Sequence, residues 1–296
     1  MQNGPFIVTG ASGQLGRQVV GHLLEAGAAP IIAVTRNPDK LADLKEKGVE
    51  VRQGDFNDPA SLGAAFAGGK RILIISTDDL EPGKRLAAHG NAIGVAAKAG
   101  VAHIVYTSLV KPSEDNPIPF TADHRDSEAL IKATGAGYTI LRNNLYTDLL
   151  LMSGQQAIAM GQLFSAAGEG RTGYVTRADC ARAAAAALMN ETGEKVLDIT
   201  GPEAVSQAEI AAILSEIAGK EIPYVPMQAE DLVQAMVANG MPEFMARVFV
   251  SFDQAIAAGY LDVVSDDLKA LTGRPGQTVR DFLMTNREAL LAPPQH

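Results

Sequence analysis

Three glycines recur at every third position near the amino end, in the segment Thr9-Gly10-Ala11-Ser12-Gly13-Gln14-Leu15-Gly16. A short apolar run, residues 6–8, precedes them, and apolar residues at helical spacing follow. At such a strand-to-helix junction the first glycine turns the chain, the second lets the backbone approach a pyrophosphate, and the third lets the helix pack on the strand. The amides at the start of the helix attract the phosphates. The pattern therefore favours dinucleotide binding over a purely structural turn. We expect the cofactor to lie along Gly10, Ala11, Ser12, Gly13, Gln14 and Leu15.

The end of the second apolar run indicates which dinucleotide is bound. Dinucleotide folds often carry a carboxylate there, which accepts hydrogen bonds from the adenosine ribose hydroxyls. This chain has Thr35-Arg36-Asn37 instead. A guanidinium cannot accept such bonds, but it can pair with a 2′-phosphate. Arg36 therefore predicts NADP as the cofactor, with NADPH preferred over NADH; the alternative is a solvated surface arginine.

Polar residues also follow the third and fourth apolar runs. After the third run, Asp55 can accept a hydrogen bond from the adenine amino group, with Phe56 alongside. The alternative role of Asp55 is a helix cap, which Asp58 before Pro59 supplies better. Ser76 and Thr77 end the fourth run and are expected to line the ribose side of the cofactor.

A parallel sheet would bring these polar segments to one edge. Apolar runs at residues 6–8, 31–34, 49–51, 72–75, 103–106 and 138–141 alternate with helical segments. Continuous apolar strands separated by helices predict a parallel sheet covered on both faces, and right-handed crossovers make it a doubly wound, Rossmann-like α/β fold. We expect an NADP-binding domain over residues 1–142, to which part of 174–200 returns. Residues 143–296 are expected to form mainly a smaller, mostly helical substrate lobe.

Together these motifs resemble a known group. The glycine segment, Arg36-Asn37-Pro38, Gly54-Asp55-Phe56, Tyr106-Thr107-Ser108 and Leu141-Arg142-Asn143-Asn144-Leu145-Tyr146 are similar to those of the NmrA-like atypical short-chain dehydrogenases. Within that class the chain is most similar to the bacterial type 2 NAD(P)H:quinone oxidoreductases and the triphenylmethane reductases. The similarity extends through residues 168–170, 175–179 and 265–268, so it covers nearly the whole chain. The resemblance implies an NADPH-binding reductase, with Ser76, Thr77, Asp78, Asn143, Asn144, Tyr146 and Tyr174 along the cofactor.

The proton relay of ordinary short-chain dehydrogenases is absent. Those enzymes use a Tyr-x-x-x-Lys pair on one helix, in which the tyrosine donates a proton and the lysine lowers its pKa. The helix expected near residues 122–134 has His124 and Glu128 instead, four residues apart on one face. A carboxylate cannot depress the pKa of a tyrosine electrostatically, but it would favour a protonated histidine. The alternative for His124 is a surface histidine bonded to Glu128.

Without a strong proton donor, the site suits acceptors that take a hydride first. Quinones fit, because their reduced product is a stabilised phenolate that can be protonated later by water or by His124. Cationic triarylmethane dyes also fit, because the hydride neutralises the cation. Catalysis then depends mostly on positioning. We expect His124 to be catalytic, Asn143 to hold the nicotinamide amide, and Tyr146 to border the acceptor, with ordinary loop structure as the alternative for the last two.

A second function class stays open. The missing relay equally suits a non-catalytic, NADP(H)-binding redox sensor or regulatory protein, a role that some NmrA-like proteins have. The aromatic residues of the C-terminal lobe favour the enzyme, because they can form a substrate pocket. A sugar-nucleotide epimerase would need the absent relay.

The composition limits the remaining possibilities. With 296 residues, of which 47% are hydrophobic and 20% charged, the chain has material for a large core. A net charge of −9 argues against nucleic-acid binding. A single cysteine, Cys180, and scattered histidines predict no disulfide framework and no metal. With no leader-like segment and no run of about 18 apolar residues, we expect a cytoplasmic protein with a small aromatic, quinone-like substrate and no membrane or nucleic-acid partner. A homodimer is left open.

Overall fold

The computed structural model describes residues 4–81 and 83–293. Its centre is a seven-stranded, wholly parallel sheet with the order β3-β2-β1-β4-β5-β6-β9. The strand order reverses between β1 and β4, as in a doubly wound Rossmann fold, so the predicted fold class is confirmed. The strands are β1 (Phe6–Val8), β2 (Ile31–Thr35), β3 (Glu50–Gln53), β4 (Arg71–Ile74), β5 (His103–Leu109), β6 (Gly137–Asn143) and β9 (Glu194–Ile199).

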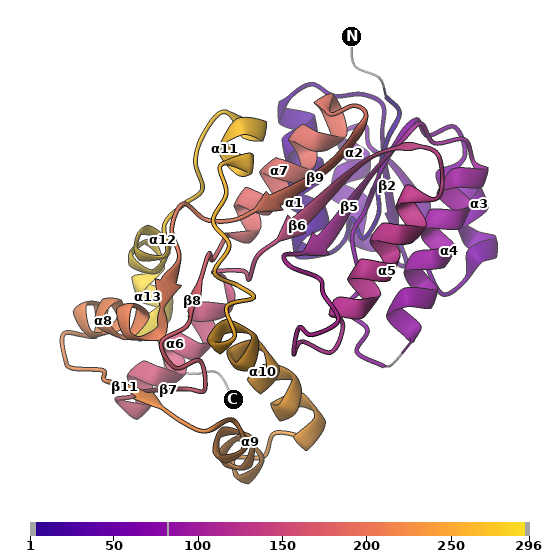
Figure 1. Cartoon of the computed structure of the whole chain (residues 1–296). Helices are drawn as coiled ribbons and strands as arrows, with labels where there is room; N and C mark the ends of the chain where they lie inside the picture. Colours follow the sequence, from indigo (N-terminus) through magenta and orange to yellow (C-terminus); the bar gives the residue numbers. More distant parts are fainter. Residues whose placement is uncertain (1–3, 82, 294–296) are drawn as a thin grey trace.

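Helices cover both faces of the sheet (Figure 1). One face packs against α1 (Gln14–Glu25) and α7 (Arg177–Asn190), and the other against α3 (Pro59–Phe66), α4 (Lys84–Lys98) and α5 (Thr121–Lys132). On β5, Ile104 and Tyr106 belong to the core under α3, α4 and α5, whereas Val105 belongs to the core under α1 and α7. Because side chains alternate along a strand, Tyr106 faces the layer that carries His124.

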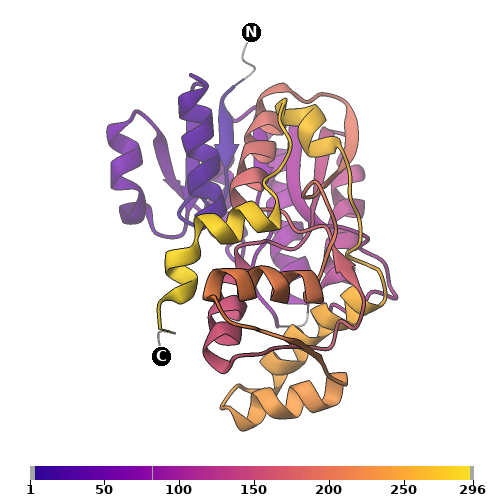
Figure 2. The same cartoon turned by 90° about the vertical axis from the view of Figure 1, so that its left-hand side faces the viewer.

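The C-terminal lobe lies at one end of the sheet (Figures 1 and 2). One part has its own apolar core, formed by α6 (Leu149–Met160), α8 (Gln207–Ala218), α12 (Val279–Thr285), α13 (Arg287–Leu291), β7 (Leu163–Ser165) and β11 (Tyr224–Pro226). A second part pairs α9 (Ala229–Ala238) with α10 (Glu243–Ala257). The remaining elements are a 3-10 helix at Pro38–Leu41, α2 (Ala42–Glu46), β8 (Arg171–Thr172), β10 (Val205–Ser206) and α11 (Asp267–Thr272).

The junction between sheet and lobe is both apolar and polar. Leu109 at the end of β5, with Val110 and Ile118 after it, packs with Ala255 and Ile256 of α10 and with Leu261. The Asn144 side chain, just after β6, donates to the carbonyls of Leu261 and Val263, at 3.0 and 3.3 Å. These contacts position the lobe beside the carboxyl ends of β5 and β6.

The helix after β6 starts later than the apolar pattern suggests. Helical spacing extends from Leu145, but α6 begins at Leu149. The intervening backbone is held in a bridge between Tyr146 and Val175, in which the Thr147 amide donates to the Val175 carbonyl at 2.9 Å. This leaves residues 144–148 as a loop at the carboxyl edge of the sheet.

Two kinds of feature are absent over residues 4–81 and 83–293. No helix there is long and apolar enough to cross a membrane. No three His, Cys, Asp or Glu side chains in those ranges gather where they could hold a metal ion.

Candidate active site

The glycine segment forms a tight cradle in front of α1. Gly10 has a φ of 59°, in the left-handed region that favours glycine. A Cβ on Gly16 would lie 2.4 Å from the Gly10 carbonyl oxygen, so the loop can pack on the helix only without a side chain there. The exposed Gly13 precedes α1, no side chain caps the helix, and its first turn carries no acidic residue. The first amides of α1 are therefore available to an external anion.

Side chains of neighbouring strands hold this cradle in place. Ser12 and Thr35 share a hydrogen bond of 2.8 Å between their hydroxyls, which ties the loop to the end of β2. Thr9 donates to the Leu73 carbonyl at 2.9 Å and accepts from the Ile75 amide at 3.0 Å, which bridges β1 and β4. The loop is thus fixed at the strand reversal, where open α/β sheets bind their ligands.

Arg36 is the free cation at the end of β2. Its side chain is exposed and makes no hydrogen bond or ion pair with the described residues. The nearby Arg17 is different, because it is bound to Asp43 at 2.7 Å and to the Lys40 carbonyl at 2.5 Å. Arg36 is therefore available for an added phosphate, whereas Arg17 supports the loop that carries it.

The other predicted adenosine contacts lie beyond β3 and β4. Asp55 accepts from the Asn57 amide at 2.9 Å, and Phe56 packs against the core under α3 and α4. Asp58 caps α3 by accepting from the Ala60 amide, so Asp55 is not the cap. Beyond β4, the Ser76 amide donates to the Thr107 hydroxyl at 2.9 Å, and Asp78 is exposed.

The end of β6 carries an unpaired acceptor. The amide oxygen Oδ1 of Asn143 is buried without a partner, while its nitrogen Nδ2 donates weakly to the Tyr146 hydroxyl at 3.4 Å. Arg177 stacks over the Tyr146 ring at 5.1 Å and binds Asp148 at 3.0 Å. A buried amide oxygen without a donor is costly, and a carboxamide N–H of a ligand would satisfy it.

Two residues that the resemblance places along the cofactor have side chains that bind partners within the protein. The Asn144 side chain is fully used at the junction with the lobe, where it also accepts from the Leu145 amide at 2.9 Å. The Tyr174 side chain is buried in the core of the lobe, and its hydroxyl accepts from Gln207 at 3.3 Å.

His124 lies in a buried polar cluster rather than on the surface. Its Nδ1 is 2.9 Å from the Tyr106 hydroxyl, which is 3.2 Å from Nδ1 of His89 on α4. Nδ1 of His89 also lies 2.9 Å from the Ser127 hydroxyl, and Nε2 of His89 accepts from the Thr77 amide at 3.0 Å. The cluster therefore connects His124 to the backbone at the carboxyl edge of β4.

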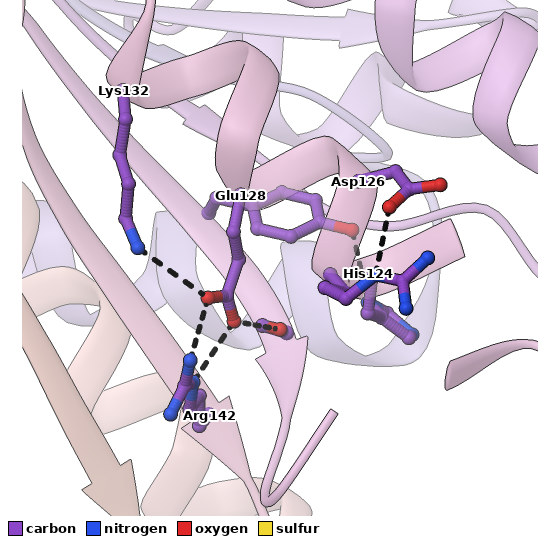
Figure 3. Close-up of polar contacts among 8 residues, drawn as sticks. His124, Asp126, Glu128, Lys132 and Arg142 are labelled. Carbon is purple, nitrogen blue, oxygen red and sulfur yellow. Dashed lines mark hydrogen bonds and ion pairs between the residues drawn. The ribbon is translucent and has the colours of Figure 1, made fainter. Parts of the chain in front are cut away.

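Glu128 does not act on His124, so the expected pairing is wrong. Figure 3 shows Glu128 turned toward Arg142 of β6 and away from His124. The two carboxylate oxygens accept from Arg142 at 2.9 and 2.7 Å, and one also accepts from Ser108 at 2.7 Å. Spacing on a helix places residues on one face, but it does not say which neighbour they contact. Glu128 therefore does not favour the protonated form of His124.

Burial and a nearby cation both disfavour the protonated form of His124. Desolvation lowers the pKa of His124 well below its usual value, and the positive charge of Arg85 lowers it further. The same two causes lower the pKa of His89 to about 3. Both imidazoles are therefore neutral at physiological pH.

Sequence reasoning missed three members of this cluster: Tyr106, His89 and Arg85. Tyr106 sits inside an apolar strand run, and His89 has no partner at metal-ligand spacing. Arg85 is buried over the Phe120 ring, 4.5 Å from its centre, and binds the carbonyls of Thr77 and Asp79. No local signal marks these residues, because they meet only when α4, α5 and β5 pack together.

The residues present fit a dinucleotide. The glycines of the cradle let a pyrophosphate approach the backbone, Arg36 is available for a 2′-phosphate, and the unpaired oxygen of Asn143 suits a carboxamide. These three features follow the carboxyl edge from β1 and β2 to β6, the path of an extended dinucleotide across the strand reversal.

Comparisons with known proteins agree with this geometry. A family model described as NAD(P)H-binding matches residues 10–191. Quinone oxidoreductase 2 of Escherichia coli (strain K12) is 35% identical over 277 residues, which cover 93% of this chain and 96% of that protein. The crystal structure of an NADPH-dependent quinone oxidoreductase of Escherichia coli with NADPH matches with a TM-score of 0.89 and 34% identity, over 95% of this chain and 99% of that one. The triphenylmethane reductase of Citrobacter sp., crystallised with NADP(H), matches with a TM-score of 0.86 and 37% identity, over 94% and 99%.

These similarities extend over nearly the whole chain, so they include both the sheet and the lobe. They confirm the predicted resemblance, NADP as the cofactor and the oxidoreductase class. The chain therefore belongs to the NAD(P)H-binding family, as an NADP-dependent oxidoreductase of the NmrA-like type.

Proposed function

We propose that the protein transfers a hydride from NADPH to a quinone or a similar electron-poor conjugated aromatic acceptor, without a Tyr/Lys proton relay. The observation that carries the proposal is the replacement of the relay: where the lysine would stand, Glu128 is buried and bound by Arg142. A carboxylate at this position cannot lower the pKa of a tyrosine, and the charges of Arg85 and Arg177 lower the pKa of Tyr106 and of Tyr146 less than burial raises it. Burial also raises the pKa of both Tyr106 and Tyr146, so neither phenol is an activated acid.

The names of the related proteins support this class of acceptor. The Escherichia coli relative is named for quinones, and the Citrobacter relative for triphenylmethane dyes. Both kinds of molecule accept a hydride at an electron-poor, conjugated centre and need no simultaneous protonation. Simple ketones and alcohols lack this property.

The bound NADPH supplies the hydride, and the chain supplies binding and orientation. We assign the 2′-phosphate to Arg36, the pyrophosphate to the amides from Gly10 to Leu15, and the adenine to Asp55 and Phe56. Ser76, Thr77 and Asp78 border the ribose, and Asn143 holds the carboxamide beside Tyr146. Tyr174 and Asn144 support the lobe, because their side chains are used there.

The acceptor belongs on the lobe side of this edge. Phe120 lies edge-on to His124, with ring centres 6.1 Å apart, and its ring is 5.9 Å from that of Phe252 on α10. This aromatic contact brings the lobe, formed mainly by residues 143–296, against the His124 cluster. Flat aromatic acceptors pack well against such rings.

A direct assay tests the proposal. The protein is mixed with NADPH and, in parallel, with a benzoquinone, a cationic triarylmethane dye and a simple ketone, and the absorbance of the reduced nicotinamide is followed. We expect oxidation with the first two and none above background with the ketone, and slower oxidation when NADH replaces NADPH. Cofactor binding without any acceptor-dependent oxidation would contradict the proposal and support a redox-sensing protein instead.

His124 is tested in the same assay. Because the His124 ring lies edge-on to Phe120, which contacts Phe252 of the lobe, His124→Ala is expected to lower quinone turnover. Undiminished turnover would remove His124 from the mechanism.

A further inference from the structure

The hydrogen bonds around His89 define its protonation. Its Nε2 accepts from the Thr77 amide at 3.0 Å, so this nitrogen carries no proton. A neutral imidazole then has its proton on Nδ1. Nδ1–H faces the Ser127 hydroxyl at 2.9 Å, and Ser127 in turn donates to the Asp123 carbonyl at 2.6 Å. His89 is therefore a donor toward Ser127 and Tyr106.

The same reasoning from hydrogen bonds shows which ring nitrogen of His124 carries the proton. The Tyr106 hydroxyl lies between Nδ1 of His89, 3.2 Å away, and Nδ1 of His124, 2.9 Å away. Because Nδ1 of His89 already carries a proton, Tyr106 donates its own to Nδ1 of His124. A neutral His124 must then carry its proton on Nε2.

The outward nitrogen of His124 remains available. Nε2 makes no hydrogen bond with the described residues, yet it is not among the enclosed, unpartnered atoms such as Asn143 Oδ1. It therefore keeps a small area open to solvent, although His124 as a whole is only 5% exposed. The Tyr106 hydroxyl orients the ring through Nδ1, and Nε2–H has no partner among the described residues. Nε2–H is therefore free to donate a hydrogen bond to a ligand.

Desolvation and the charge of Arg85 keep both imidazoles neutral. Arg85 faces them from α4, and Asp123 and Glu128 lie on α5, where Glu128 is neutralised by Arg142. Asp78 and Asp79 lie beside Arg85 on the loop after β4. Desolvation and Arg85 both oppose a positive charge on His124.

We infer that His89 and Tyr106 are positioning residues that hold His124 as the neutral, Nε2-protonated tautomer, so that Nε2–H donates a hydrogen bond, and not a proton, to an acceptor oxygen. For neutral rings the tautomer follows from the contacts, whereas the role toward an acceptor rests on the proposed function.

The chemistry explains why the proton stays on His124. Transfer of a hydride to one carbonyl oxygen of a quinone forms an O–H bond, makes the ring aromatic and moves the π pair of the other carbonyl onto its oxygen, which gives a hydroquinone monoanion. Giving up Nε2–H would leave an imidazolate, and Tyr106 cannot replace that proton without becoming a buried phenolate, a form disfavoured by its raised pKa. The oxyanion is therefore stabilised by the hydrogen bond and takes its proton from water.

This assignment separates two acceptor classes. A quinone develops negative charge on oxygen, so it gains from the Nε2–H donor. A cationic triarylmethane dye loses its charge when the hydride reaches carbon and presents no oxyanion. The donor therefore matters for quinones and not for such dyes.

A spectroscopic experiment tests the tautomers independently of activity. The chain has five histidines, so the side-chain nitrogens of protein labelled with ¹⁵N-histidine can be assigned by single substitutions. Between pH 6 and 8, without cofactor, we expect His124 protonated at Nε2 and His89 at Nδ1, with neither doubly protonated. In Tyr106→Phe, Nδ1 of His124 loses its donor, and its signal is expected to move toward that of a free or mixed tautomer. A wild-type His124 that is protonated at Nδ1, or doubly protonated at pH 6, would overturn the inference.

Kinetics test the role. Tyr106→Phe is expected to lower kcat for a quinone about tenfold, with KM for NADPH and turnover of a cationic triarylmethane dye unchanged within about twofold. The control is Tyr138→Phe on β6, whose hydroxyl lies 3.4 Å from Glu194 and does not contact the cluster. Equal losses for quinone and dye, or no loss for either, would contradict the role.

A conservative replacement separates a hydrogen-bond donor from a proton donor. The amide nitrogen of His124→Gln reproduces the position of Nε2 and has no titrating proton, so this variant is expected to keep most quinone turnover, unlike His124→Leu. Equal losses in both would contradict the inference. If Tyr106→Phe does not fold, this pair and the wild-type spectrum decide the outcome. Wild-type protein that reduces no quinone would contradict the proposed function and leave the tautomer result to be judged separately.

Discussion

Glu128 and Arg142 form a two-point ion pair, in which the guanidinium donates to both carboxylate oxygens at 2.9 and 2.7 Å. The Glu128 side chain is 3% exposed and the Arg142 side chain 28% exposed. The pair joins α5 to β6, directly behind the polar edge of the sheet. Glu128 occupies the position of the lysine in a Tyr-x-x-x-Lys relay, but its contacts form a structural brace that holds α5 against β6.

Removing this brace is expected to affect stability and not cofactor binding. Glu128→Leu leaves Arg142 and Ser108 without their partner, so the free energy of unfolding is expected to fall by about 3 kcal/mol. The control Lys132→Gln removes only an exposed cation 4.0 Å from the same carboxylate and is expected to change stability by less than about 0.5 kcal/mol. Urea unfolding and NADPH titration measure both effects. A fully stable Glu128→Leu protein that no longer binds NADPH would contradict the structural role.

The glycine cradle offers a matched pair of variants on one helix. In Gly16→Ala the new Cβ would lie 2.4 Å from the Gly10 carbonyl oxygen, so the loop must shift and NADPH affinity is expected to fall at least tenfold. In Gly21→Ala nothing lies within 4 Å of the new Cβ, and alanine is the better helix former by about 1 kcal/mol. We expect Gly21→Ala to bind NADPH normally and to be slightly more stable. Calorimetric titration with NADPH distinguishes the two, and unchanged binding by Gly16→Ala would mean that the loop does not hold the cofactor.

Arg36 is expected to decide between the two nicotinamide cofactors. A charge-assisted contact to phosphate contributes about 1.5–3 kcal/mol, so Arg36→Ala should raise the Kd for NADPH about 10- to 100-fold. The Kd for NADH should stay within about twofold, because NADH lacks the 2′-phosphate. Lys47→Ala, which removes another exposed cation of the NADP-binding domain, serves as the control. Parallel losses for both cofactors in Arg36→Ala would place Arg36 away from the 2′-phosphate.

The features that the sequence predicted well are local ones. The glycine cradle, the cap by Asp58 and the apolar strands depend on residues that are neighbours in the chain, so spacing alone identifies them.

The features that could not be predicted are contacts across elements. The spacing of His124 and Glu128 suggested a pair, but Arg142 on the neighbouring strand binds Glu128 more favourably, through two charged hydrogen bonds. In the sequence Tyr106 belongs to an apolar strand run, which does not indicate a polar contact. Only the packing of α4 against α5 brings His89 next to its hydroxyl. A single sequence indicates which side chains share one face of a helix or strand. It does not indicate which residues of other elements those side chains contact.

Three buried histidines are expected to make the fold sensitive to acid. Desolvation lowers the pKa of His89 to about 3, that of His103 to about 4 and that of His124 well below its usual value. In the unfolded chain these imidazoles bind a proton near pH 6.5, whereas in the folded chain they stay neutral to lower pH. Their contribution to stability is therefore complete above pH 6.5 and is lost as the pH falls toward 4. His89 and His103 then each cost about 1.4 kcal/mol of stability between pH 7.5 and 5.5, or about 3 kcal/mol for the two, and His124 acts in the same direction.

His103 isolates one of these contributions. Its Nε2 lies 2.9 Å from the Thr139 hydroxyl, a contact that the amide of His103→Gln can preserve without a titrating group. The buried carboxyl of Asp253 has a raised pKa and acts in the opposite direction at lower pH, but it is present in both proteins and cancels in the comparison. Urea unfolding at pH 7.5 and 5.5 should therefore show a loss smaller by about 1.4 kcal/mol in His103→Gln than in the wild type. Equal losses in the two proteins would mean that His103 binds its proton as readily in the folded state as in the unfolded one.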